Sequence, residues 1–220
     1  MQYLCKGLAE VQKITPANDF YDPAFAFLSN GMERLFKVML CLNYKQLEGE
    51  LPTPGKLWGR KNGHDIVYFK SKIEEICIPL EVAFAKGDYE LITQDETINS
   101  ICKVLSEYGQ KARYFNLDVV LGREQEFNSK TEWQDLKVEV LKEYYGEEKF
   151  SGLIQKPECL EKIYLKANKI LVSKIELFLR AITRQFVLGN FSSESKLYAF
   201  DINTFLAIDD ADIGTIEYYK

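Results

Sequence analysis

Residues 22–42 read DPAFAFLSNGMERLFKVMLCL, and their apolar side chains follow the period of an α-helix. Asp22 and Pro23 supply an N-cap followed by a proline at the first helical position. The pattern predicts a long amphipathic helix that begins at this pair and ends near Gly49. Its buried stripe recurs at alternating steps of three and four residues and comprises Phe25, Leu28, Met32, Leu35, Met39 and Leu42.

Four further segments repeat the helical period. Helices are expected over 65–87, with a kink at Pro79, and over 98–115. A capping box at its start predicts a helix over 131–146, and a proline opens a long helix over 157–188. The sequence therefore predicts an all-α helical bundle.

Domain organisation follows from the same pattern. Residues 1–190 are expected to form the helical bundle, because helical periodicity prevails until that point. Residues 191–220 are dense in apolar and aromatic side chains but carry no long helical stripe, so they are expected to form a packed, irregular tail with a short strand or helix.

The composition is that of a globular protein. The 220 residues are 46% hydrophobic and 28% charged, and no segment approaches the roughly eighteen apolar residues of a membrane-spanning helix. We expect a cytoplasmic protein with no membrane partner, whose five scattered cysteines are reduced. The net charge of -5 gives no global attraction for phosphate, so binding of RNA or a nucleotide would need a local basic patch.

His64 is the only histidine of the chain. Zinc sites with several imidazoles, HD-type phosphohydrolase centres and H-E-x-x-H proteases all need a second histidine, so these classes are excluded. A Ser-His-Asp or Cys-His arrangement would have to use His64, and no G-x-S-x-G elbow accompanies it. We expect no metal site and no cofactor.

The loop 51–63 is the most distinctive irregular segment. Lys56, Arg60 and Lys61 are interleaved with Trp58, a combination suited to phosphate contact with base stacking. A solvated connection between helices, in which Trp58 caps the core, explains the same residues.

The pair His64-Asp65 stands where this loop meets the next predicted helix. Asp65 can accept hydrogen bonds from the first-turn N–H groups of that helix, and a neutral histidine can cap or pack there. Helix capping therefore explains the pair about as well as catalysis does.

Three motifs in residues 22–118 resemble the HEPN superfamily of helical domains. Residues 33–40, ERLFKVML, look like the family's first long helix, in which a Glu and a Lys lie one turn apart, a spacing that also suits an intrahelical ion pair. Residues 63–66, GHDI, resemble the start of its second helix, and Arg113-Tyr114 resembles a dipeptide near the end of its third. The order and separation of the three motifs carry the likeness.

The resemblance implies an all-α, HEPN-like helical bundle, and residues 119–220, which it does not cover, are expected to form a helical C-terminal extension. It also implies a protein that often dimerises and acts in RNA or nucleotide metabolism, in prokaryotic toxin-antitoxin or phage-defence systems. We therefore expect a binding or assembly module, a homodimer, with a cognate nucleotidyltransferase or antitoxin as a partner.

Two alternatives remain open. HEPN ribonucleases are similar in pairing an Arg with a His without metal, and here His64 would be the acid or base with Arg60 or Arg113 as the phosphate clamp. Arg60 and His64 are closer in sequence than that family's pair, and no histidine follows Arg113. The other alternative is a small-ligand receptor, with a pocket framed by Tyr114, Asn116 and Asp118.

Overall fold

The chain folds into helices throughout the part that is described. The computed structural model is 71% helix, and no strand occurs among the residues it describes. The all-α prediction is therefore confirmed. The described residues are 1–59, 63–111, 120–122 and 127–219.

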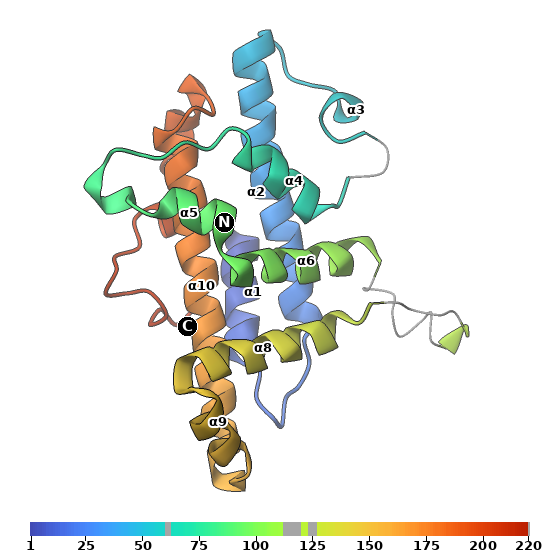
Figure 1. Ribbon diagram of the computed structural model, residues 1–220. Helices are drawn as coiled ribbons and strands as arrows, with labels where there is room; N and C mark the ends of the chain where they lie inside the picture. The colour runs from blue at the N-terminus through green and yellow to red at the C-terminus, as the bar shows by residue number, and fades with distance from the viewer. Residues whose placement is uncertain (60–62, 112–119, 123–126, 220) are drawn as a thin grey trace.

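Some helices run along the length of the molecule, and others lie across them (Figure 1). The lengthwise helices α1, α2 and α10 pack beside one another, while α4 and α6 pack on α2, and α8 packs on both α6 and α10. The helices are α1 (Gln2–Gln12), α2 (Asp22–Glu48), α3 (Pro54–Leu57), α4 (Ile66–Glu74), α5 (Asp88–Gln94), α6 (Glu96–Gln110), α8 (Ser129–Tyr145), α9 (Glu147–Ile154), α10 (Leu160–Leu188) and α11 (Asn203–Leu206). Short 3-10 helices are η1 (Ala83–Ala85), η3 (Pro157–Cys159) and η4 (Ser193–Tyr198).

Helix α2 matches its prediction. Its predicted stripe is buried from Phe25 to Leu42, and the chain leaves the helix at Gly49 in a left-handed conformation, with φ of 81°. Asp22 and Pro23 are the first two helical residues, so the N-cap is Tyr21 rather than Asp22. The long helix follows from the sequence period because tertiary packing uses the same face that the period defines.

The predicted kinked helix over 65–87 is wrong, because α4 ends at Glu74. Pro79 lacks an N–H group, and its ring disfavours a helical conformation for the residue before it. The chain instead extends, and Gln185 of α10 satisfies the freed backbone at Ile78. Its amide oxygen accepts from the Ile78 N–H at 3.2 Å, and its amide nitrogen donates to the Ile78 carbonyl at 2.6 Å.

The predicted capping box at 131–134 is also wrong. Helix α8 begins two residues earlier, at Ser129, because the Asn128 side chain accepts hydrogen bonds from the N–H groups of Lys130 and Thr131 at 3.0 and 3.3 Å. Asparagine is among the strongest N-cap residues, so the nearer cap determines the start. The sequence pattern predicted no separate helix at the positions of α1, α5 and α9.

Helix α10 confirms the last predicted helix and buries much of its length. Its main body is α-helical, and the predicted start at Pro157 forms the 3-10 turn η3. None of the described helices is long and apolar enough to cross a membrane. The tail that follows α10 forms η4 and α11, with Ile202, Phe205 and Ile208 buried against the core. Helix α6 ends at Gln110, with Lys111 as its C-cap, and residues 112–115 of the predicted helix lie outside the described residues.

The cysteines are unpaired thiols. Cys77 and Cys102 are buried, and burial raises the pKa of each thiol to about 12. Buried thiols in apolar surroundings are poor nucleophiles, so these two serve packing.

Helices α1 and α2 approach each other through a reciprocal pair of glycines. A Cβ on Gly7 would lie 2.6 Å from Cγ of Leu28 and 2.9 Å from its backbone nitrogen. A Cβ on Gly31 would lie 2.6 Å from Cδ2 of Leu4. Each glycine therefore accommodates a leucine of the other helix at backbone contact distance.

We expect Gly7→Ala to lower the free energy of unfolding by about 1–3 kcal/mol, because the added methyl group forces the two backbones apart. Gly152→Ala on α9 is the matched control, since no atom lies within 4 Å of its Cβ position and it should gain about 0.5–1 kcal/mol. Urea unfolding followed by circular dichroism measures both. Equal stability of Gly7→Ala and wild type would contradict the close approach.

Candidate functional site

Two motifs of the family resemblance meet where α4 begins, against the middle of α2. Nδ1 of His64 lies 2.9 Å from Oε2 of Glu33, and Nζ of Lys37 lies 2.6 Å from Oε1 of the same carboxylate. The predicted Glu33–Lys37 ion pair is therefore present. Glu33 is only 15% exposed, whereas the His64 side chain is 57% exposed, so the pair joins a half-enclosed carboxylate to an open imidazole.

This geometry fixes how the neutral imidazole carries its proton. An ionised carboxylate only accepts hydrogen bonds, so Nδ1 of His64 must donate to Glu33. Nε2 then holds the free lone pair. An exposed imidazole held in this tautomer by a carboxylate has the arrangement that a general base requires.

Trp58 lies beside this cluster and is half-buried against the core rather than exposed. Nζ of Lys37 lies 4.8 Å from the centroid of its ring, and Phe69 packs edge-on against it, with centroids 5.8 Å apart. Lys37 thus occupies one face of the indole that base stacking would use. The contacts of Trp58 are those of a residue that caps the core.

Asp65 caps α4, as the sequence suggested. Its Oδ1 accepts from the N–H of Tyr68 at 2.9 Å and from the hydroxyl of Ser106 on α6 at 3.0 Å. Gln110 in turn donates to that hydroxyl at 3.1 Å. These bonds engage the carboxylate and tie the start of α4 to α6.

Lys56 belongs to a different set of contacts. Its Nζ lies 3.4 Å from Oε1 of Glu50 and 5.5 Å from the centroid of the Tyr44 ring. Hydrogen bonds to Tyr44 and Glu50 raise the pKa of this ammonium group. The remaining predicted site residues lie outside the described residues: Arg60, Lys61, Arg113, Tyr114, Asn116 and Asp118.

Sequence reasoning missed Ser106 and Gln110, and it missed that Glu33 reaches His64. Ser106 and Gln110 lie one turn apart on α6, but a serine and a glutamine give no signal of their own in a chain of this composition. Within the described part of the chain, no group of three or more His, Cys, Asp or Glu residues could hold a metal ion.

The chemistry of the described cluster is limited by its charge balance. Glu33 faces the two nitrogen groups of Lys37 and His64, so its negative charge offsets the cation that could otherwise hold a phosphate. What remains open to a ligand is the Nε2 edge of His64.

Comparison with known proteins identifies no relative: no family model, no curated protein and no solved structure matches the chain.

Proposed function

We propose that the chain is a HEPN-like binding and assembly module that acts in an RNA- or nucleotide-linked stress or phage-defence process, without catalysis of its own. The observation that carries the proposal is that both carboxylate oxygens of Glu33 are already paired, one with His64 and the other with Lys37. In this function the cluster fixes the start of α4 on α2, which is a structural task.

The ion pairs of the nearby lysines favour a non-catalytic module over an enzyme that cleaves a phosphodiester. Cleavage needs a cation or a set of donors aimed at the developing phosphoryl charge. Lys37 is already paired at 2.6 Å with a largely buried carboxylate, and Lys56 is paired with Glu50. Neither of these two lysines is free to bind a phosphate at the Nε2 edge of His64.

A surface groove supports the homodimer that belongs to this proposal. A cavity of about 210 Å³ lies between α1, α2 and the tail, with Tyr3, Val38 and Tyr198 in its lining. These three side chains are exposed, and Phe200, two residues after Tyr198 in the chain, is 90% exposed. Clustered exposed apolar residues are typical of interaction surfaces, and a second copy of the chain is the partner we propose here.

The metal-independent ribonuclease remains a second candidate because of one observation. The His64 imidazole is more than half exposed while its Nδ1 is held by Glu33, the arrangement that orients Nε2 for proton transfer. In that candidate Glu33 would be a positioning residue.

The test combines an RNA assay with a mass measurement on the wild-type chain. We expect end-labelled RNAs of mixed sequence to stay intact in the presence of EDTA, and light scattering to give the mass of a dimer. His64→Ala should change only the free energy of unfolding, by on the order of 1 kcal/mol, because it removes a single hydrogen bond. Lys72→Ala, which removes an exposed ion pair on α4, is the matched control.

The outcome that contradicts the module is cleavage of RNA without metal by the wild type, reduced about a hundredfold or more in His64→Ala. In that case Glu33→Gln should also lower the rate, because the amide holds the imidazole less firmly. A monomeric mass would contradict the homodimer alone.

A further inference from the structure

The tail that follows α10 presents large apolar side chains to solvent in the stretch 197–200. Leu197 is 79% exposed, Tyr198 is 43% exposed and Phe200 is 90% exposed. Large apolar side chains that gather on one surface are typical of a site where another molecule packs. Phe200 is the most exposed of the three, so it is the side chain that gains most from a partner.

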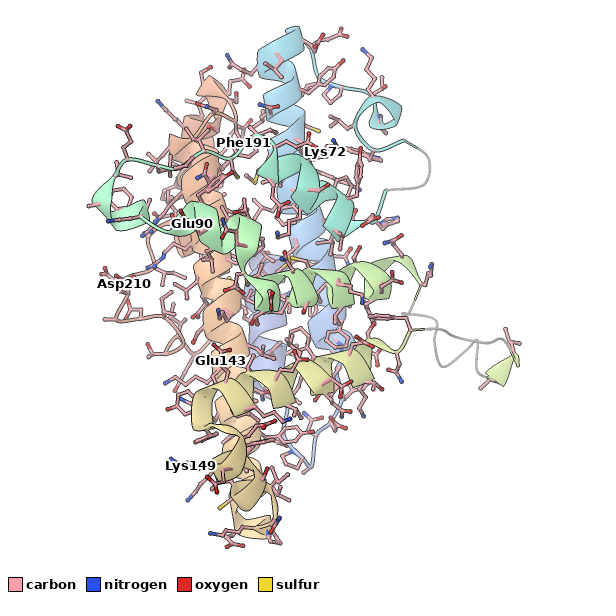
Figure 2. All side chains as sticks on the ribbon, in the orientation of Figure 1. Lys72, Glu90, Glu143, Lys149, Phe191 and Asp210 are labelled. Atoms are coloured by element: carbon pink, nitrogen blue, oxygen red, sulfur yellow. The ribbon has the colours of Figure 1, made fainter. Side chains whose placement is uncertain are left out.

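Contacts with α2 and α10 hold this part of the tail in place. Nζ of Lys45 on α2 lies 2.6 Å from Oε1 of Glu194, and the Asn43 side chain donates to the Phe191 carbonyl at 3.2 Å. Phe191, labelled in Figure 2, is fully buried just after the end of α10. An exposed ring that stands on a fixed backbone loses little conformational entropy when it binds, which favours association through Phe200.

The groove between α1, α2 and the tail has a size that suits such a ring. Its volume is about 210 Å³, and its lining includes Leu35 and Phe186. An apolar cavity of about 150 Å³ is enough to hold benzene, so a phenyl ring fits. Phe200 is not part of the lining, but the next residue, Asp201, is. Because successive Cα atoms are about 3.8 Å apart, Phe200 stands at the rim of the groove while its exposed ring leaves the groove unfilled.

Opposite charges flank this groove without pairing with each other. Arg34 of α2 and Asp201 of the tail both belong to its lining. The Arg34 guanidinium lies over the Tyr3 ring, 4.5 Å from its centroid, and neither Arg34 nor Asp201 forms an ion pair with a described residue. A surface that carries an unpaired cation and an unpaired anion is complementary to itself, as an interface between two identical copies requires.

We propose that two copies of the chain associate through this face about a two-fold axis, with Phe200 of each copy in the groove of the other and Arg34 of each copy beside Asp201 of the other. This inference rests on the homodimer of the proposed function and assigns the surface that forms it. A two-fold interface uses the same surface patch on both copies, so two rings and two grooves are filled at once. A head-to-tail contact would leave one ring exposed and one groove empty.

Sedimentation equilibrium of the full chain tests the role of Phe200. We expect Phe200→Asp to raise the dissociation constant of the dimer about thirtyfold or more, because it removes a central aromatic anchor and places a carboxylate at an apolar groove. Phe20→Asp is the matched control, since Phe20 is a 61% exposed phenylalanine that does not line the groove. This control should dimerise as the wild type does, and circular dichroism verifies that both variants are folded.

Charge reversal distinguishes pairing between copies from pairing within one chain. Arg34→Glu and Asp201→Arg each bring like charges together across the interface, so each variant alone should dimerise about tenfold or more weakly. An equimolar mixture of the two should form heterodimers with an affinity close to that of the wild type. The Arg34→Glu copy is acidic at both positions and the Asp201→Arg copy is basic at both, so both contacts become attractive. Mixing cannot restore an ion pair that lies within one chain.

Four results would overturn the proposal. A folded Phe200→Asp that dimerises as tightly as the wild type would refute this interface and leave the homodimer of the proposed function intact. A mixture of the charge variants that stays monomeric would refute the pairing of Arg34 with Asp201, and a wild-type mass above that of a dimer would refute the two-fold arrangement. A monomeric wild type would refute the homodimer and the interface together, whereas the RNA assay tests the non-catalytic module by itself.

Discussion

Replacing Trp133 by alanine will lower the free energy of unfolding by about 3–5 kcal/mol. Trp133 is fully buried, and its ring meets Phe25 of α2 edge-on, with centroids 5.3 Å apart. The side chain lies on α8, which packs on α6 and α10, so the truncation leaves a cavity at the junction of several helices. The indole N–H has no hydrogen-bond partner among the described residues, so no acceptor is left unsatisfied by the change.

Urea unfolding monitored by far-ultraviolet circular dichroism measures this loss. Val138→Ala is the control on the same helix, because Val138 is 39% exposed and its truncation should cost less than about 1 kcal/mol. A loss below about 1 kcal/mol for Trp133→Ala would mean that the Trp133 ring does not pack against Phe25 in the core.

The helices predicted well from the sequence are those in which the signals for the start, the apolar stripe and the end all indicate the same segment. In α2 a proline near the start, a period of three and four and Gly49 at the end all indicate the same segment. In α4 the apolar period continues past Glu74, but Pro79 and the contact of Gln185 with Ile78 determine the end. That contact joins residues 107 positions apart, which no local pattern can reveal.

For the candidate site, too, local features could be predicted from the sequence and contacts between distant residues could not. The capping role of Asp65 could be predicted because a cap is a local property of the sequence. The contact between Glu33 and His64 spans 31 residues and depends on how α4 crosses α2, so only the resemblance suggested that these motifs belong together.

Lys137 carried a signal that sequence reasoning missed. It lies four residues after Trp133 and three before Val140, which places it on the buried stripe of α8. A lysine on an apolar stripe is an exception to the pattern, and such exceptions concentrate at functional sites.

The second large effect is expected from Lys137→Met, which should raise the free energy of unfolding at pH 7 by roughly 2 to 3 kcal/mol. Burial lowers the pKa of Lys137 from 10.5 to about 8, so the folded protein holds this proton less tightly than the unfolded chain does. The full penalty of the buried charge is present below pH 8 and declines as the pH rises from about 8 toward 10.5. The wild type should therefore become more stable relative to Lys137→Met over that interval.

Urea unfolding of both proteins at pH 7 and pH 9.5 measures this change. The comparison must be made as a difference, because burial also raises the pKa of Cys77, Cys102 and Tyr21, and ionisation of these groups in the unfolded chain lowers stability at alkaline pH in both proteins. Lys142→Met, on the exposed side of the same helix, should follow the wild type at each pH. A constant difference between wild type and Lys137→Met across this pH range would show that folding does not lower the pKa of Lys137.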